Sequence, residues 1–191
     1  MKTSKTIKIV VLALLLIAFA MILHKNLPRT AIVQITGTDV KRVDRSAAKS
    51  KDLQANSKRG AVDRTIDVRF INAVSRKGKV MVFRNEDTGW GWPPYFKFDS
   101  ADLTAMAQAF STTEEKPWVR VKYYGWRIRI FSMFPNAVDL KEVDREYTHI
   151  PLFNIVFLCL LIILAFLIRR KYKQLVEWAR GLKKQKAARK E

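Results

Sequence analysis

The order of apolar and polar residues divides the chain into three parts. Two unbroken apolar runs, residues 9–23 and 152–168, lie near the ends, and between them short stretches alternate apolar with polar residues. A helix that spans a bilayer needs about 20 mostly apolar residues, whereas alternation is typical of half-buried β-strands. The pattern therefore predicts transmembrane helices at 9–27 and 150–168 that flank a β-rich domain at 28–149.

The central domain alternates in several stretches and has a helical pattern in one. Asp99 or Ser100 can cap the helix, whose apolar stripe follows at helical spacing: Leu103, Met106, Ala107 and Phe110. The predicted strands are 31–43, 66–70, 80–84, 119–123 and a last one that combines 127–130 with 138–143.

Three strands, a helix and two strands is the order of the oligonucleotide/oligosaccharide-binding (OB) barrel, a five-stranded, partly open Greek-key form. The polar stretch 44–64 is then the loop between the first two strands, with a short helix near 46–53 as an option. We expect an OB-like five-stranded barrel with one helix between strands 3 and 4, and a generic α+β open sheet is the alternative. Both predict the same core, which comprises Ile32, Ile35, Val68, Phe70, Val82, Leu103, Phe110, Val119, Val121, Ile128 and Ile130.

Basic residues are densest after the second apolar run. The formal net charge of +19 divides into +3 before the first run, +8 in the centre and +8 in the tail, where 10 residues are basic and 2 acidic. Cytoplasmic flanks of membrane helices carry an excess of Lys and Arg, and long translocated domains escape this rule. We therefore expect a two-pass protein of a bacterial inner membrane, with both termini cytoplasmic and the central domain periplasmic.

The first apolar run follows a basic, cytoplasmic N-terminus at 1–8 that contains Lys2, Lys5 and Lys8. The triplet Ala18-Phe19-Ala20 is typical of a cleavable secretion signal. Because residues 21–23 prolong the apolar run beyond that triplet, cleavage would leave an apolar terminus. An uncleaved signal anchor is therefore the favoured interpretation.

The second apolar run leads directly into a basic tail at 169–191. Apolar residues recur there at helical spacing, so the tail is expected to be helical. It would lie on anionic lipid or a cytoplasmic partner, or it is simply an orientation signal with a solvated basic end. The residues expected at the membrane interface are His24, His149, Arg169, Arg170, Lys171 and Trp178.

Residues 85–100, NEDTGWGWPPYFKFDS, concentrate aromatic and turn-forming residues between a predicted strand and the predicted helix. The Pro93-Pro94 pair excludes an interior strand, so the aromatics decorate an ordered loop. The single cysteine, Cys159, lies in the second apolar run, so an internal disulfide is excluded. Trp90, Trp92 and Tyr95 then either complete a small core or contact something docked on the barrel.

A resemblance to a protein family covers most of residues 30–143 and rests on three sequence motifs: NEDTGWGWPPYFKFDSADL, WVRVKYYGWRI and FSMFPNAV. They resemble an uncharacterised bacterial family of small membrane proteins, defined as a domain of unknown function. The resemblance implies a bacterial membrane protein with no assigned reaction. It therefore transfers no catalytic residue to this chain.

No catalytic residue, metal site or cofactor is predicted. The two histidines, His24 and His149, lie at the outer edges of the apolar runs, where they either meet and titrate together or remain without partners. Glu86, Asp87 and Asp99 could support acid–base chemistry, but turn formation and helix capping explain them more simply. We therefore expect a non-enzymatic protein, and an unrecognised carboxylate-dependent hydrolase is the least favoured alternative.

Basic residues alternate with apolar ones near the last predicted strands, and this basic ladder comprises Arg120, Lys122, Arg127 and Arg129. The leading hypothesis is a membrane-anchored periplasmic binding or scaffold protein whose partners are the bilayer and another envelope protein. The alternative is a module that binds anionic lipid headgroups or envelope glycans through Trp90, Trp92, Tyr95 and the ladder. No nucleic-acid ligand is expected in the periplasm, and the ladder is also explained by the solvent side of half-buried strands.

Overall fold

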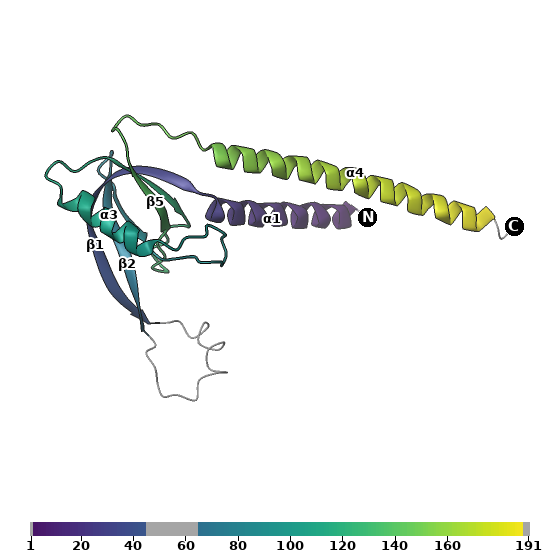
Figure 1. Cartoon of the computed structure of the whole chain (residues 1–191). Coiled ribbons are helices and arrows are strands. Elements are labelled where there is room, and N and C mark those ends of the chain that lie inside the picture. Colours follow the sequence, from purple (N-terminus) through teal and green to yellow (C-terminus); the bar gives the residue numbers. More distant parts are fainter. Residues whose placement is uncertain (1, 45–64, 189–191) are drawn as a thin grey trace. The chain divides into compact units, whose positions relative to one another are not determined.

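A computed structural model describes residues 2–44 and 65–188 of the chain (Figure 1). It divides into two units, 1–149 and 150–191. The short helix considered near 46–53 lies outside the described residues. In order, the elements are α1 (Lys2–Asn26), β1 (Arg29–Asp44), β2 (Thr65–Ser75), β3 (Val80–Arg84), α3 (Ser100–Thr112), β4 (Val119–Tyr124), β5 (Asn136–Glu142) and α4 (Leu152–Ala188).

The five strands form a closed barrel in the order β1-β2-β3-β5-β4. Strand β1 pairs antiparallel with both β2 and β4, and β3 meets β5 in parallel. Helix α3 lies between β3 and β4 in the chain and packs Leu103 and Ala107 into the core. This arrangement confirms the predicted OB-like barrel and is inconsistent with the alternative of an open sheet.

Strand β1 pairs with two different strands along its length. Its first part, Arg29 to Val33, pairs with β4, and from Val33 onwards it pairs with β2 as far as Asp44. A register shift between Ile35 and Gly37 interrupts the pairing of β1 with β2, and such irregularities bend a strand and increase its twist. Beyond the bend, β1 and β2 continue together as a long ribbon (Figure 1).

The core combines one face of each strand with one face of α3. Ile35, Val68, Phe70, Leu103, Val119 and Val121 are buried as predicted, and Phe110 is half-buried against the core. Ile32 and Val82 are only half-buried, because their neighbours Val33 and Phe83 take the inward positions. Around Ile32 and Val82 the strands carry apolar residues on both faces, so the sequence does not show which face points inward. An error of one residue in this assignment exchanges the two faces of a strand.

The strand predicted at 127–130 is wrong. The chain instead forms a tight hairpin at 126–134, closed by the isolated pair Ile128↔Met133, and β5 begins only at Asn136. Ile128 is half-buried, and Ile130 is 90% exposed at the tip rather than in the core. Gly125 and Pro135 lie against each other at the base of the hairpin, so the nine residues between them double back instead of joining the sheet.

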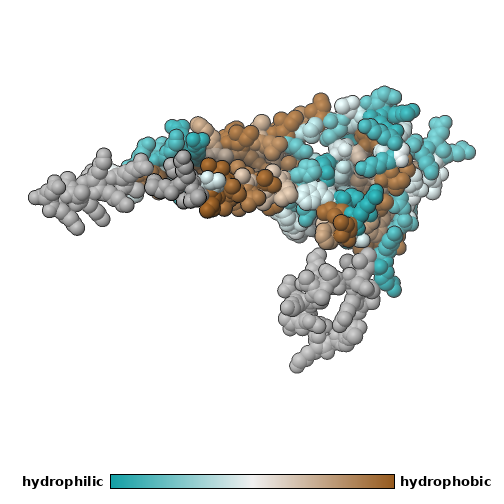
Figure 2. Space-filling view, turned by 180° about the vertical axis from the view of Figure 1, so that it is seen from behind, coloured by the Kyte–Doolittle hydropathy of each residue, from teal (hydrophilic) through white to brown (hydrophobic). Residues whose placement is uncertain are grey.

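The two long helices are apolar over most of their length. Thr6–Asn26 and Leu152–Trp178 are each long and apolar enough to cross a membrane, with 21 and 27 residues. At about 1.5 Å per residue, the shorter segment covers about 32 Å, close to the hydrocarbon thickness of a bilayer. Figure 2 shows this apolar surface in brown on the helices, while the barrel carries a mixture of hydrophilic and hydrophobic patches.

Candidate functional site

The loop at 86–99 joins β3 to α3 and is ordered by its own hydrogen bonds. The backbone N–H groups of Thr88 and Gly89 both donate to the carbonyl oxygen of Lys97, at 3.1 and 3.0 Å. The hydroxyl of Thr88 accepts from the Lys97 N–H at 3.1 Å, which binds the two sides of the loop together again. The loop is therefore a folded part of the domain, as the sequence predicts.

A buried polar cluster lies beneath this loop. Asn85 and Lys97 are only 1% and 3% exposed. The Lys97 ammonium donates to Asn85 Oδ1 and, at 2.8 Å, to the carbonyl oxygen of Ala137. Asn85 Nδ2 in turn donates to the Ser100 carbonyl at 2.7 Å and to Thr104 Oγ1 at 2.9 Å. Burial of such groups is tolerated because each finds a partner.

This cluster completes the barrel where its backbone pairing is weakest. Strands β3 and β5 share one paired position, Arg84↔Asn136. Beyond it, the Asn136 side chain accepts from the Glu86 N–H and donates to the Glu86 carbonyl oxygen, both at 3.0 Å, as a strand residue would. The bond from Lys97 to Ala137 extends the contact by one residue. Side chains therefore close the seam between β3 and β5.

The electrostatics of Lys97 fit a structural role. Burial lowers its pKa to about 8, although the carboxylates of Asp99, Asp87 and Glu86 oppose the shift. With a pKa of about 8 the side chain is mostly an ammonium at neutral pH, and two of its three N–H donors bond Asn85 Oδ1 and the Ala137 carbonyl oxygen. Sequence reasoning missed Lys97. Its one signal was that it is the single basic residue in the stretch 85–100.

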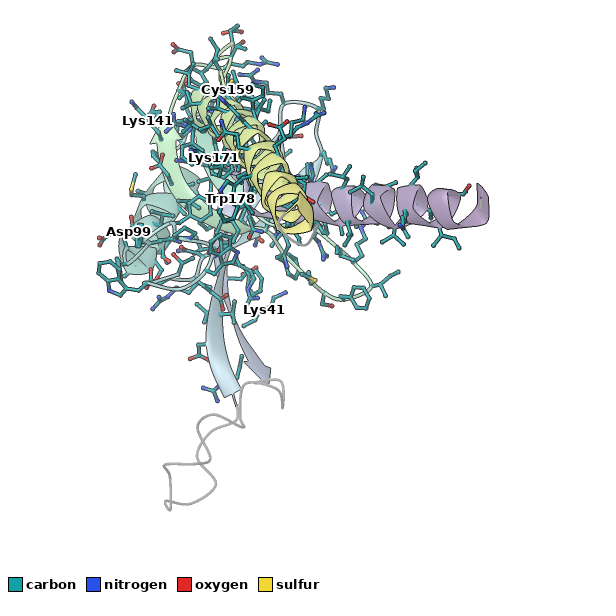
Figure 3. The ribbon with its side chains drawn as sticks, turned by 90° about the vertical axis from the view of Figure 1, so that its right-hand side faces the viewer. Lys41, Asp99, Lys141, Cys159, Lys171 and Trp178 are labelled. Atoms are coloured by element: carbon teal, nitrogen blue, oxygen red, sulfur yellow. The ribbon has the colours of Figure 1, made fainter. Side chains whose placement is uncertain are left out.

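The three acids of the loop at 86–99 each have a place in the local structure. Asp87 accepts from the Ser100 N–H at 2.9 Å and from its hydroxyl at 2.8 Å, and so it caps α3 from thirteen residues away. Asp99 occupies the N-cap position, but its side chain makes no capping hydrogen bond, contrary to expectation. Glu86 pairs with Arg84 at 2.6 Å. Figure 3 labels Asp99 beside the start of α3.

The two tryptophans of the loop lie outside the core. Trp90 is 84% exposed and Trp92 77% exposed. Trp90 meets the rings of Phe96 and Phe98 edge to face, with centroids 5.4 and 5.7 Å apart, and both phenylalanines are exposed. We call these three residues the Trp90 cluster. The idea that the tryptophans complete the core is wrong, whereas Tyr95 of the same loop is half-buried.

The same end of the barrel is bonded to the last turn of α1. Trp126 Nε1 donates to His24 Nδ1 at 2.8 Å, and the Gly125 N–H donates to the Lys25 carbonyl at 2.9 Å. Tyr95 donates its hydroxyl to the Asn26 carbonyl. Three consecutive residues of α1 are therefore held by the barrel.

The tyrosine in this contact is positioned by a second ring. Tyr95 stacks on Tyr124 with centroids 4.6 Å apart and an interplanar angle of 16°. Burial raises the pKa of both phenols, so each stays protonated and able to donate. The arrangement combines apolar contact with a directed hydrogen bond to the helix end, a use to which tyrosine is well suited.

The predicted basic ladder separates into two places. Arg120 and Lys122 lie on β4, where Arg120 pairs with Asp139 at 2.8 Å. Arg127 and Arg129 belong to the hairpin at 126–134, and the Arg127 guanidinium lies 3.9 Å from the centroid of the Phe134 ring. The four residues therefore do not form one continuous surface along two strands.

The remaining predicted interface residues lie in the two long helices or, for His149, in the connection between β5 and α4. His24 contacts Trp126, whereas His149 stacks on Tyr147, so each histidine has a different aromatic partner. The exposed side chains of α4 that the sequence places at the interface are Arg169, Arg170, Lys171 and Trp178, of which Figure 3 labels the last two. Within residues 2–44 and 65–188, no group of three potential ligands is arranged to hold a metal ion.

Comparison with known proteins gives a family without an assigned activity. An uncharacterized protein of Haemophilus influenzae is 42% identical over 121 residues, which cover 63% of this chain and 65% of the relative. The chain thus spans just under two thirds of that relative's length. No solved structure matches the chain. The profile of a family described as protein of unknown function (DUF1523) matches residues 4–176, which include the whole barrel and most of both apolar helices. The chain therefore belongs to this DUF1523 family.

Proposed function

We propose that the protein is a non-enzymatic scaffold that holds its barrel at the outer face of a bacterial inner membrane and binds another envelope protein there. The observation that carries this proposal is the exposure of Trp90 and Trp92 on a loop that is anchored by the buried, hydrogen-bonded residues Asn85 and Lys97. The Trp90 cluster and Trp92 form the contact surface. The two apolar helices and their basic flanks support the membrane placement.

The aromatic surface has the properties of a protein-binding site. Exposed apolar groups that gather on one surface mark interaction sites, and tryptophan is enriched among the residues that contribute most to binding. The rigid base of the loop lowers the entropy cost of binding, because the surface is already ordered. Phe96 has a φ of +50°, an unfavourable backbone conformation for a bulky residue, and such strain is concentrated at functional sites.

The charge of the loop argues against an anionic ligand at this surface. Glu86, Asp87 and Asp99 outnumber the single lysine between residues 85 and 100, and that lysine is buried. An anionic headgroup would therefore approach a locally negative loop. A hydrolase based on these acids is disfavoured as well, since Asp87 and Glu86 are already bound to Ser100 and Arg84.

Replacing both tryptophans by alanine, Trp90→Ala and Trp92→Ala, should abolish recovery of the partner after cross-linking of the full chain in native membranes. The physical reason is the loss of the two largest exposed rings of the surface. Trp178→Ala is the matched control, because Trp178 is also exposed but lies on α4. If the double variant recovers the same proteins in the same yield as the wild type, this surface is not the contact.

A periplasmic phosphatase fused after Glu115 should be active, since Glu115 is exposed in the connection between α3 and β4. The same enzyme fused after Glu191 should be inactive, because the basic tail is assigned to the cytoplasm. Activity measured in whole cells, with fusion levels compared by immunoblot, tests both. The opposite pattern from stable fusions would overturn the proposed orientation.

A further inference from the structure

The hairpin at 126–134 presents apolar side chains to solvent at its tip. Ile130 is 90% exposed and Phe131 is 72% exposed. Solvent exposure of two adjacent large apolar residues is unfavourable for a soluble surface unless another apolar phase covers them. The barrel core does not use them, because the sheet resumes only at Asn136.

The tip is held in place by the rest of the hairpin. Ile128 and Met133 exchange two backbone hydrogen bonds at 3.2 and 3.0 Å, and the Ser132 N–H donates to the Arg129 carbonyl at 3.0 Å. Arg127 donates to the Met133 carbonyl at 3.0 Å and covers the Phe134 ring. The exposure of the tip is thus a property of an ordered turn.

The base of the hairpin lies at the end of the first apolar run. Trp126 is bonded to His24, the residue that follows the run 9–23. Ile130 comes only four residues after Trp126, and an extended chain covers at most about 3.6 Å per residue, or about 14 Å. If α1 spans a bilayer, the tip is therefore within reach of the acyl region of the adjoining leaflet.

The charges on the hairpin suit a lipid surface. Arg127 and Arg129 lie on the arm of the hairpin that leads to the tip, and the segment 126–134, WRIRIFSMF, contains no acid. Arginine side chains near an interface reach towards lipid phosphates while neighbouring apolar residues lie deeper. Tryptophan at the base is likewise typical of the interfacial region. This pattern differs from that of the loop at 86–99, which is acidic.

We propose that the hairpin at 126–134 inserts Ile130 and Phe131 into the leaflet at the C-terminal end of α1, with Arg127 and Arg129 at the level of the lipid phosphates. The occupant of this apolar surface is the same bilayer that α1 spans, so the inference rests on the membrane placement in the proposed function. It does not depend on the Trp90 cluster or on any protein partner.

Quenching by lipids with nitroxide groups on their acyl chains tests the insertion. The full chain carrying Cys159→Ser receives a single cysteine, Ile130→Cys, labelled with an environment-sensitive dye and reconstituted in vesicles of phosphatidylcholine and phosphatidylglycerol. We expect quenching several-fold stronger than at the control position Lys77→Cys, which is exposed in the turn between β2 and β3. Equal quenching at the two positions would overturn the proposal.

A third labelled position separates failure of this inference from failure of the membrane placement. Leu16→Cys lies in the middle of the apolar run of α1. Strong quenching at Leu16 without quenching at Ile130 rejects the hairpin alone, whereas no quenching at either position rejects the placement and the hairpin together.

The role of the arginines has a separate readout. Arg129→Gln should reduce the difference in Ile130 quenching between vesicles with phosphatidylglycerol and vesicles of phosphatidylcholine alone. An undiminished difference would remove the arginine from the proposal.

Discussion

Replacing Asn85 by alanine is expected to lower the free energy of unfolding by about 3 kcal/mol or more. The amide of Asn85 is 1% exposed and bonds Lys97, the Ser100 carbonyl and the Thr104 hydroxyl. Alanine removes all three bonds and leaves the buried Lys97 amine with one acceptor fewer. Chemical denaturation of the full chain in detergent, followed by tryptophan fluorescence, measures the change.

Asn72→Ala is the matched control for this substitution. Asn72 also uses its amide in a hydrogen bond, to Asp39 at 2.6 Å, but the bond is exposed on the outer side of β1 and β2. Its loss should cost no more than about 0.5 kcal/mol, as is usual for surface positions. Equal effects of the two substitutions would show that the buried cluster does not stabilise the barrel.

The second large effect is a dependence of stability on pH that originates at Lys97. The pKa of its amine is lowered by burial from 10.5 in the unfolded chain to about 8 in the folded protein. Between these two values the unfolded chain binds a proton that the folded protein does not, so the free energy of unfolding rises with pH. The penalty for burying the charge is fully present below pH 8 and disappears above about pH 10.5. A shift of this size corresponds to about 3 kcal/mol.

The contribution of Lys97 is isolated by comparison with Lys97→Met. The difference in unfolding free energy between the wild type and this variant should move in favour of the wild type as pH rises from about 8 to about 10, because other titrating groups are common to both proteins. Lys141→Met, at an exposed position of β5, controls for the loss of one lysine. A difference that stays constant over this pH range would contradict the assignment.

The order of elements was predictable because it depends on periodicity within short segments. Alternation places the strands, and the stripe that contains Leu103 and Ala107 places the helix, so the barrel order follows. The inward face was not predictable where both phases are apolar, as at Ile32 and Val33. Local alternation at 127–130 was also misleading, because a hairpin and a strand share the same short pattern.

The candidate site was predictable only in part, for a physical reason. The concentration of Trp90 and Trp92 in one loop is visible in the sequence, but their exposure depends on which loop residue turns inward. Lys97 does so because Asn85 and the Ala137 carbonyl, twelve and forty residues away, offer acceptors at one point. The apolar and polar pattern of a short segment does not reveal hydrogen bonds between residues that are so far apart in the chain.

The hydrogen bonds from the barrel to His24, Lys25 and Asn26 have a mechanical consequence. A domain joined to its anchor by a free linker turns independently of it, whereas a domain bonded to three consecutive helix residues turns with the helix. Apolar helices tilt to match the thickness of their bilayer. If α1 spans a bilayer as proposed, its tilt in a thinner membrane would turn the barrel with it and change the direction in which the Trp90 cluster faces.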